Sequence, residues 1–335
     1  MDTKKKTQAA RAMAALTLST VTVIGASPRD ALAAQAANYP ERAVTMIVPF
    51  PAGGPTDLVA RVLAKQLTEQ MGQPFIVENR GGANGNIGMQ AAATAGSDGY
   101  TLLYNTSSIA LSPNLYRSLS FDPIKDFAGI STTATIPLVL LTHPSLPTPT
   151  VQEFVEYARQ RPGKLSYASS STGNVTHLTN VMFLQSVGVE AMHVPYRGSS
   201  PALTDLVGGQ VMFMTNTLND SLPFIRDGRV RALAISSAKR SDRLPDVPTL
   251  EQSGLQGFDV GAWQGVVAPS GTPASIIQRL NGEIRKALAS EVMQKQLALQ
   301  GAYSLGSTPQ EYDAFIRSET TRWGEVVKAA QVKLD

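Results

Sequence analysis

The chain has 335 residues, which predicts about two domains and a hydrophobic core large enough to need no cross-links. It contains no cysteine, so disulfides, thiolate metal sites, iron–sulfur clusters and cysteine nucleophiles are excluded. Its 29 Lys and Arg exceed its 26 Asp and Glu, and this basic excess at first indicates an anionic partner.

Residues 1–33 are predicted to be a secretory signal peptide. Lysines at 4–6 and Arg11 precede an apolar stretch at 13–26, and Ala31 and Ala33 form a small-x-small cleavage site. We therefore expect cleavage after Ala33 and a periplasmic location. A membrane anchor is disfavoured because the apolar stretch has about 14 residues, whereas a spanning helix needs roughly 20.

Removal of residues 1–33 changes the charge argument. The 29 basic residues fall by five to 24, and the 26 acidic residues fall by two to 24, so the mature chain is formally neutral. Its basic residues are dispersed along the chain, and we therefore expect no nucleic-acid partner.

From residue 42, short β-branched runs alternate with amphipathic helical stretches, which is typical of α/β units with parallel sheets. We predict a strand at 44–48, a Gly/Pro loop at 49–57, and a helix with Thr56 or Asp57 as its N-cap. Three further elements complete this part, namely a strand at 75–77 with a Gly-rich turn at 79–86, a helix at 87–95, and a strand at 100–104 that ends in the polar segment 105–108.

The second half of the chain repeats this alternation after a strand at 138–141 and a Pro-rich passage at 143–149. We expect helices at 151–161, 175–187, 201–207, 274–288, 290–300 and 309–327, and strands at 165–168, 193–196, 211–215, 230–236 and 259–268. If the last strand pairs with the first lobe, lobe 1 comprises residues 40–141 plus 262–335 and lobe 2 comprises residues 142–261. Two strands then cross between the lobes, and a ligand cleft lies between them.

The recurring local element is a strand end, a loop rich in Gly, Ser or Thr, and a helix N-terminus. Such a terminus offers unpaired N–H groups and about half a unit of positive charge. Four such loops, two in each lobe, can therefore enclose a small anion without any Lys or Arg. For any single loop, an ordinary turn is the alternative interpretation.

Other kinds of site find little support in the sequence. The loop at 49–57 lacks the Gly-Lys-Ser/Thr of a phosphate-binding loop, and no Gly-x-Gly-x-x-Gly follows the first strand. His143, His177 and His193 are 34 and 16 residues apart, which is not metal-ligand spacing, and no Gly-x-Ser-x-Gly elbow is present. We expect no metal, no cofactor and no catalytic residue.

Several loop motifs run in order through the mature chain: VPFPAGGPTD at 48–57, VENRGG at 77–82 with GNIG at 85–88, DGYTL at 98–102, VPYRG at 194–198 with PALTD at 201–205, LPDVPT at 244–249 and VAPSGTP at 267–273. Together they closely resemble the Bug family of periplasmic solute-binding proteins, the receptors of tripartite tricarboxylate transporters. The resemblance implies a Venus-flytrap fold of the periplasmic-binding-protein type, with two α/β lobes joined by two crossing strands and the ligand held between them.

The resemblance also implies which residues contact the ligand. In the family, the loop after the first strand holds a ligand carboxylate through backbone and hydroxyl groups, and the second lobe closes over the remainder. The first-lobe contacts carried onto this chain are Phe50, Ala52, Gly53, Gly54, Thr56, Asp57, Ala83, Asn84, Ser107 and Ser108. The second-lobe contacts are Ser169, Ser171, Thr172, Asn174, His177, Arg197, Gly198, Thr215 and Asn216.

Elementary chemistry makes the first-lobe roles more specific. Thr56 can donate its hydroxyl to a carboxylate, and N–H groups near Gly53 and Gly54 can approach closely because no Cβ intervenes. Asp57 is unexpected in an anion site, and it can cap the helix, accept from a water molecule or pair with Arg61.

Two second-lobe residues bear on the rest of the ligand. Arg197 can hold a distal carboxylate with two hydrogen bonds, or it can be a solvated loop residue. Asn216 stands where the family often has an acid, and a neutral amide there favours a carboxylate without an amine.

We therefore expect a solute-binding protein that captures a small organic carboxylate by lobe closure and delivers it, as a monomer, to the membrane subunits of a tripartite tricarboxylate transporter. A ligand receptor for a sensor kinase and an extracytoplasmic α/β enzyme are the alternatives. Dicarboxylates, tricarboxylates, aromatic acids, amino acids and nicotinate-like compounds all fit a site that recognises one carboxylate.

Overall fold

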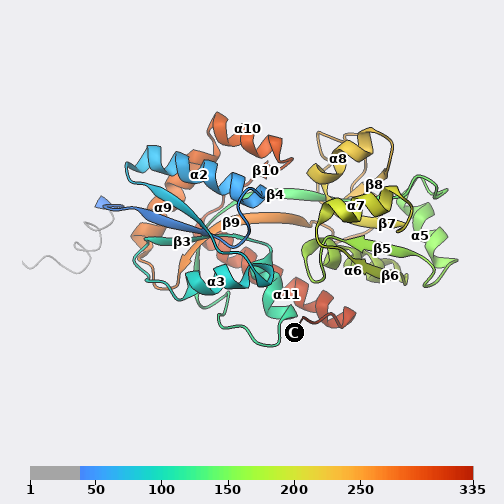
Figure 1. The fold of residues 1–335 in the computed structure, drawn as a ribbon, viewed down its shortest axis with the longest axis horizontal. Coiled ribbons are helices and arrows are strands. Elements are labelled where there is room, and N and C mark those ends of the chain that lie inside the picture. The colour runs from blue at the N-terminus through green and yellow to red at the C-terminus, as the bar shows by residue number, and fades with distance from the viewer. Residues whose placement is uncertain (1–37, 335) are drawn as a thin grey trace, which may run out of the picture.

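The structure is a computed structural model that describes residues 38–334. The signal peptide predicted at 1–33 lies outside the described residues. Two α/β lobes lie next to each other along the long axis of the molecule, and β4 (Phe127–Thr142) and β9 (Gly261–Pro269) run through the junction between them (Figure 1). This confirms the predicted two-lobed α/β architecture.

The first lobe contains a mixed sheet. Three parallel strands, in the order β2 (Phe75–Asn79), β1 (Val44–Val48) and β3 (Thr101–Thr106), continue into the antiparallel strands β9 and the first half of β4. The short strand β10 (Tyr303–Ser304) pairs with β4. Because the three parallel strands end at the same edge, the loops that follow them lie together.

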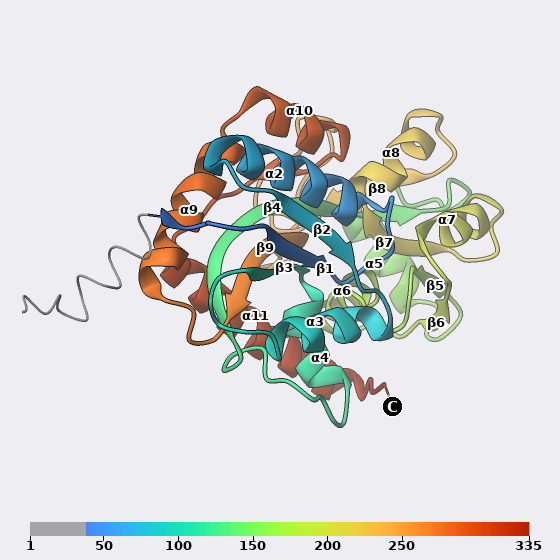
Figure 2. The same ribbon diagram turned by 60° about the vertical axis from the view of Figure 1, so that its left-hand side comes forward.

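Helices cover both faces of this sheet (Figure 2). On one face lie α2 (Pro55–Met71), α9 (Ala274–Leu288) and α10 (Glu291–Leu299), and on the other lie α3 (Asn86–Ala93), α4 (Ser108–Leu115) and α11 (Pro309–Ala330). The side chains of β1 alternate accordingly: Met46 joins the α2/α9 core, whereas Ile47 packs with Met89 of α3.

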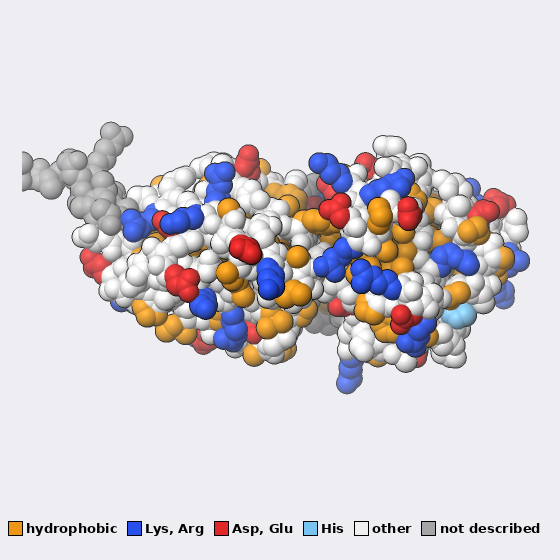
Figure 3. Space-filling model, turned by 90° about the horizontal axis from the view of Figure 1, so that it is seen from above, with side chains coloured by type: hydrophobic (Ala, Val, Ile, Leu, Met, Phe, Trp, Pro, Cys, Tyr) orange, Lys and Arg blue, Asp and Glu red, His pale blue; other side chains and the backbone are white. Residues whose placement is uncertain are grey.

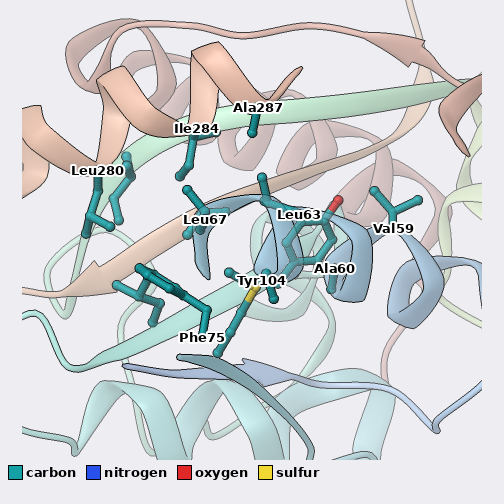
Figure 4. Close-up of a cluster of buried hydrophobic side chains, with 14 of the residues drawn as sticks. Val59, Ala60, Leu63, Leu67, Phe75, Tyr104, Leu280, Ile284 and Ala287 are labelled. Carbon is teal, nitrogen blue, oxygen red and sulfur yellow. The ribbon is translucent and has the colours of Figure 1, made fainter. Parts of the chain in front are cut away.

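The core between α2 and α9 shows why this side of the lobe is stable. Leu63 and Leu67 of α2 face Leu280 and Ile284 of α9, with Tyr104 of β3 beneath them (Figure 4). Burying each such side chain stabilises the fold by roughly 1.5–3 kcal/mol, so the start of α2 is held on a rigid layer.

The second lobe repeats the layered design around a smaller sheet. Strand β5 (Ser166–Ser169) pairs in parallel with β6 (Met192–Pro195) and β7 (Phe213–Thr217), and the second half of β4 pairs antiparallel with β7 and β8 (Arg231–Ile235). Two core clusters cover its faces, one containing α5 (Val151–Arg159) and α6 (Val175–Val187), the other α7 (Ser199–Val207) and α8 (Leu218–Arg226).

Helix α11 connects the two cores. It begins beside β4 in the first lobe, where Tyr312 and Ile316 are buried. Its last turns bring Trp323, Val326 and Val327 into the core that contains α5 and α6. The C-terminal helix therefore packs on both sides of the junction.

Most elements lie where the sequence places them, and α6 and α9 have the predicted bounds. The helices α4 and α8 are missed because Pro113 and Pro223 lie inside them and normally end a helical pattern. The first half of β4 is missed because it is rich in small and polar residues and contains two register shifts.

The predicted N-cap of α2 is wrong. The helix begins at Pro55, with Gly54 as its N-cap, instead of following Thr56 or Asp57. Proline suits the first helical position because its φ angle is already helical and its missing N–H would be unpaired there. No helix within residues 38–334 has the length and apolar character needed to cross a membrane.

Candidate functional site

A cavity of about 240 Å³ lies between the two lobes. First-lobe residues Phe50, Pro55, Thr56, Asn84, Thr106, Ser107, Ser108 and Leu111 line it together with Ile136, Ala262, Trp263 and Gln264 of the connecting strands. The second lobe contributes Asn174, Val175, Thr217, Asn219 and Asp220. A volume of this size suits a small organic molecule.

Four helices begin at this cavity. Each of these helices contributes a lining residue from its N-cap or first turn. These residues are Thr56 of α2, Ser108 of α4, Asn174 at the N-cap of α6, and Asn219 of α8. Their N-terminal N–H groups and dipoles provide positive potential. Because the described lining residues include no Lys, Arg or His, this potential comes from the backbone.

Asp57 organises the loop that precedes α2. Its carboxylate accepts from the Gly53 N–H at 2.8 Å, from Arg61 Nε at 2.9 Å and from Asn79 Nδ2 at 2.8 Å, and the residue is 1% exposed. Burial raises the pKa of Asp57, but the hydrogen bonds from Arg61, Gly53 and Asn79 outweigh it and hold the pKa below its ordinary value.

These contacts decide between the roles considered for Asp57. It pairs with Arg61 and fixes the loop instead of lining the cavity. The Gly53 N–H donates to this carboxylate, which corrects the expectation that it points at the ligand.

A tight turn brings Asn84 to the cavity. Ala83 and Asn84 have φ angles of 47° and 56°, within a 3-10 turn at Ala83–Gly85. The turn packs closely on the loop after β1, since a Cβ on Gly88 would lie 2.8 Å from the Cα of Pro49. Asn84 Nδ2 is buried without a hydrogen-bond partner, so the turn presents an unused donor.

The start of α4 is tied to the connecting strand β9. The Ser107 N–H donates to the Trp263 carbonyl at 3.0 Å. Trp263 Nε1 in turn donates to Glu319 Oε2 at 3.0 Å, and Trp323 Nε1 donates to the same oxygen at 3.1 Å. Glu319 on α11 therefore fixes the side chain of Trp263, a residue that lines the cavity.

In the second lobe, His177 supports the loop at 169–174 without lining the cavity. The backbone N–H of His177 donates to Asn174 Oδ1 at 3.0 Å, and the ring Nδ1 of His177 accepts from the backbone N–H of Gly173 at 3.1 Å. Its ring stacks on His193, 3.9 Å away between centroids, and His193 Nε2 bonds Ser169 Oγ at 2.7 Å. Burial, and then His193, lower the pKa of His177 to about 3, and burial lowers that of His193 to about 4.

The structure brings six of the residues expected at the site together around the cavity: Phe50, Thr56, Asn84, Ser107, Ser108 and Asn174. In the first lobe, Ala52, Gly53, Gly54, Asp57 and Ala83 belong to the same loops but do not line the cavity. In the second lobe, the residues outside the lining are Ser169, Ser171, Thr172, His177, Arg197, Gly198, Thr215 and Asn216.

The second-lobe difference has a clear cause at β7. The strand runs two residues further than predicted, to Thr217. Thr215 and Asn216 are therefore buried within it, where Thr215 bonds Asn180 Oδ1 at 2.7 Å and Asn216 bonds Ser199 and Ser221. Arg197 is exposed on the loop after β6.

The residues that take their place come from the start of α8, which the sequence analysis missed. Thr217, Asn219 and Asp220 line the cavity there. The helical spacing of the buried Leu218 and Leu222 was the available signal, and Pro223 masked it.

The lobes also touch beside the cavity, at a lateral contact formed by Ser241, Arg243, Ala298, Gly301 and Tyr303. Tyr303 donates to Ser241 Oγ at 2.7 Å, and Arg243 donates to the Ala298 carbonyl near the end of α10. A Cβ on Gly301 would lie 3.1 Å from the Cβ of Asn219, so α8 packs closely on the first lobe here.

Within residues 38–334, no group of three or more His, Asp and Glu side chains is arranged to hold a metal ion. The residues that line the cavity provide hydroxyls, amides, helix N-termini and one carboxylate. This set of groups is suited to binding a small polar ligand.

Comparison with known proteins identifies the family. The family model described as tripartite tricarboxylate transporter family receptor matches residues 59–332. Protein BugT of Bordetella pertussis is 39% identical over 319 residues, which cover 95% of this chain and 98% of BugT.

Solved structures agree with this assignment. An R. palustris protein with adipate has 38% identity and a TM-score of 0.75, over 88% of this chain and 99% of that chain. The periplasmic binding protein BugD has 36% identity and a TM-score of 0.73, over the same shares of 88% and 99%. The chain therefore belongs to the tripartite tricarboxylate transporter receptor family, the periplasmic solute-binding proteins that include the Bug proteins.

Proposed function

We propose that this protein captures a small organic carboxylate between its lobes and presents it to the membrane subunits of a tripartite tricarboxylate transporter. The observation that carries the proposal is the convergence of four helix N-termini on a cavity whose described lining has no basic side chain. The related protein that was solved with adipate, a dicarboxylate, supports this ligand class.

The first lobe supplies the donors for the ligand carboxylate. The ligand carboxylate oxygens accept from N–H groups in the first turns of α2 and α4, and from the hydroxyls of Thr56, Ser107 and Ser108. Asn84 adds an amide that has no partner within the described residues. Asp57 contributes indirectly, because it holds the loop that presents Thr56.

The second lobe contacts the rest of the ligand. Asn174 and the start of α6 face the cavity from one side, and α8 faces it from another. We assign residues 40–141 plus 262–335 to the first lobe and residues 142–261 to the second. A ligand that contacts both lobes favours the state in which they are close. The gain equals the difference in its affinity for the close and separated states.

We place this activity in the periplasm, after removal of residues 1–33, in a monomer that performs no chemical step and needs no cofactor. Its output is delivery of the ligand to a transporter. Identification of the bound partner by cross-linking in membranes tests this output, since recovery of a sensor kinase without transporter subunits would contradict it.

The binding site is tested by calorimetric titration with a panel of carboxylic acids. For the acid that binds, Thr56→Ala should weaken affinity by about 10- to 100-fold, as expected for a lost hydrogen bond to a charged group. Thr204→Ala is the matched control. Thr204 is an exposed residue of α7 whose hydroxyl donates to the Ser200 carbonyl, and it does not line the cavity.

Two further measurements complete this test. Arg197→Ala should keep most of the affinity, because Arg197 does not line the cavity. Mass spectrometry should recover the acid unchanged after incubation with the protein. Consumption of the acid would indicate an enzyme, and unaltered affinity in Thr56→Ala would refute the proposed site.

A further inference from the structure

Asp220 is the one ionisable side chain among the described residues that line the cavity. It is the third residue of α8 and is only partly buried. Its Oδ2 accepts from Thr217 Oγ1 at 2.9 Å, and no ion pair within residues 38–334 involves its carboxylate. The carboxylate therefore faces the ligand space without a cationic partner from the protein.

Asp57 and Asp220 occupy the same position in their helices but differ in their partners. Asp57 occupies the equivalent third position of α2, where it is buried and accepts from Gly53, Arg61 and Asn79. Asp220 has the same relation to its helix but one hydroxyl partner. The fold supplies three hydrogen-bond donors to the Asp57 carboxylate but only one to the Asp220 carboxylate, which can therefore accept further hydrogen bonds.

The residue beside Asp220 also belongs to this wall. Asn219 lines the cavity, and its Oδ1 is buried without a hydrogen-bond partner. The opposite wall presents the first turns of α2 and α4. Within the described residues, the cavity therefore has its one acidic side chain on α8 and none on the first-lobe side.

On this basis, and resting on the proposed function, we propose that the ligand carries a protonated amine as well as a carboxylate. The carboxylate lies at α2 and α4, and the amine donates to Asp220 on α8. Closing the lobes removes water from the Asp220 carboxylate, and such a charge is costly to enclose unless an opposite charge pairs with it. Since the described lining offers no cation, the ligand supplies it.

This inference reverses the expectation drawn from Asn216. That expectation assumed that the end of β7 contacts the ligand and carries no acid. The structure buries Asn216 and brings an acid to the cavity from a position four residues later, in the first turn of α8. A ligand without an amine would place a second negative charge in the same cavity as Asp220.

The test uses matched acids that differ at one carbon atom. The sets are propanoate, lactate and alanine; succinate, malate and aspartate; and glutarate, 2-hydroxyglutarate and glutamate. Calorimetric titration compares the hydrogen, hydroxyl and ammonium members of each set at neutral pH. In the set that fits the cavity, we expect the ammonium member to bind at least about ten-fold tighter than the unsubstituted acid.

Two variants then assign the effect to Asp220. Asp220→Asn should lower the ratio of affinities between ammonium and unsubstituted members by about ten-fold or more, and should leave the unsubstituted acid bound as well or better. Asp227→Asn, at the exposed end of the same helix, should leave the ratio unchanged. A loss of overall stability would not change this ratio in the same way.

The outcomes separate the two proposals. Tighter binding of unsubstituted or hydroxyl members by the natural protein would overturn the amine inference and leave the carboxylate function intact. An equal loss of affinity for all three members in Asp220→Asn would overturn it as well. Absence of binding to every carboxylate would refute the proposed function and this inference with it.

Discussion

Replacing Glu319 with alanine should destabilise the protein and disturb the cavity from a distance. The residue is 4% exposed on α11, and its Oε2 accepts from both Trp263 Nε1 and Trp323 Nε1. Its Oε1 lies 2.8 Å from Arg322 Nη2. Alanine leaves two buried indole N–H groups without an acceptor, and each unsatisfied group costs about 1–3 kcal/mol. The expected loss in the free energy of unfolding is therefore about 2–6 kcal/mol.

Glu319→Gln separates hydrogen bonding from charge. An amide oxygen in place of Oε2 can still accept from both indoles, but the ion pair with Arg322 is lost. We therefore expect a loss about half as large as for alanine, or less. The order of the two variants, with glutamine the milder, follows directly from the shared oxygen.

Urea unfolding followed by tryptophan fluorescence is the appropriate assay, because the chain has two tryptophans and both contact Glu319. Glu325→Ala, exposed on the same helix, should change the free energy of unfolding by less than about 0.5 kcal/mol. Because Trp263 lines the cavity, Glu319→Ala should also weaken ligand binding. An unfolding free energy within about 1 kcal/mol of the natural protein would refute this account of the Glu319 contacts.

Two further predictions concern pH and lobe closure. The pKa values of His177 and His193 are lowered from 6.5 to about 3 and about 4. The unfolded chain therefore takes up protons below pH 6.5 while the folded chain does not, so the free energy of unfolding should decrease as the pH is lowered from 6.5 to 4. The more deeply buried His177 should contribute the larger part of this decrease, because solvent screens the half-buried His193. Urea unfolding at several pH values should show a shallower fall for His177→Gln with His193→Gln, and a profile parallel to that of the natural protein would contradict this. Arg243→Ala with Tyr303→Phe removes the lateral contact, so the ligand-free protein should have a larger radius of gyration in solution scattering. Arg240→Ala, whose guanidinium bonds Gln252 and Pro245 within the second lobe, should not change it, and equal scattering from all variants would show that the lateral contact does not hold the lobes together.

The fold was largely predictable because its signals are local. Alternating buried residues such as Met46 and Ile47, and the helical spacing of Leu63 and Leu67, identify strands and helices without any knowledge of packing. Pro113 and Pro223 produced the two missed helices, because tertiary packing accepts a proline that a local rule treats as a stop.

The candidate site was less predictable, and the reason is register. A difference of two residues in the end of β7 moves the wall of the cavity from Asn216 to Asp220. The roles of Asp57 and His177 depend on partners distant in sequence, such as Asn79 and His193, so their residue types alone left several roles open. Trp263 and Glu319 come together from segments 56 residues apart, and no motif marks them.

On the face of the molecule shown in Figure 3, the acidic and basic side chains form no patch of a single sign. On the face seen from above, Lys and Arg are interspersed with Asp and Glu over both lobes (Figure 3). The neutral count expected for the mature chain agrees with this mixture. Recognition of an anion is therefore better assigned to the helix N-termini at the cavity than to a charged patch.

In the proposed function, helix N-termini between the lobes hold the ligand carboxylate. A crystal structure of the complex with the tightest acid of the calorimetric panel tests it most directly. We predict carboxylate oxygens at hydrogen-bond distance, about 2.7–3.2 Å, from the Thr56 hydroxyl and from Ser107 or Ser108. A carboxylate held instead by basic side chains such as Arg197, with no contact to the first turns of α2 and α4, would contradict the account.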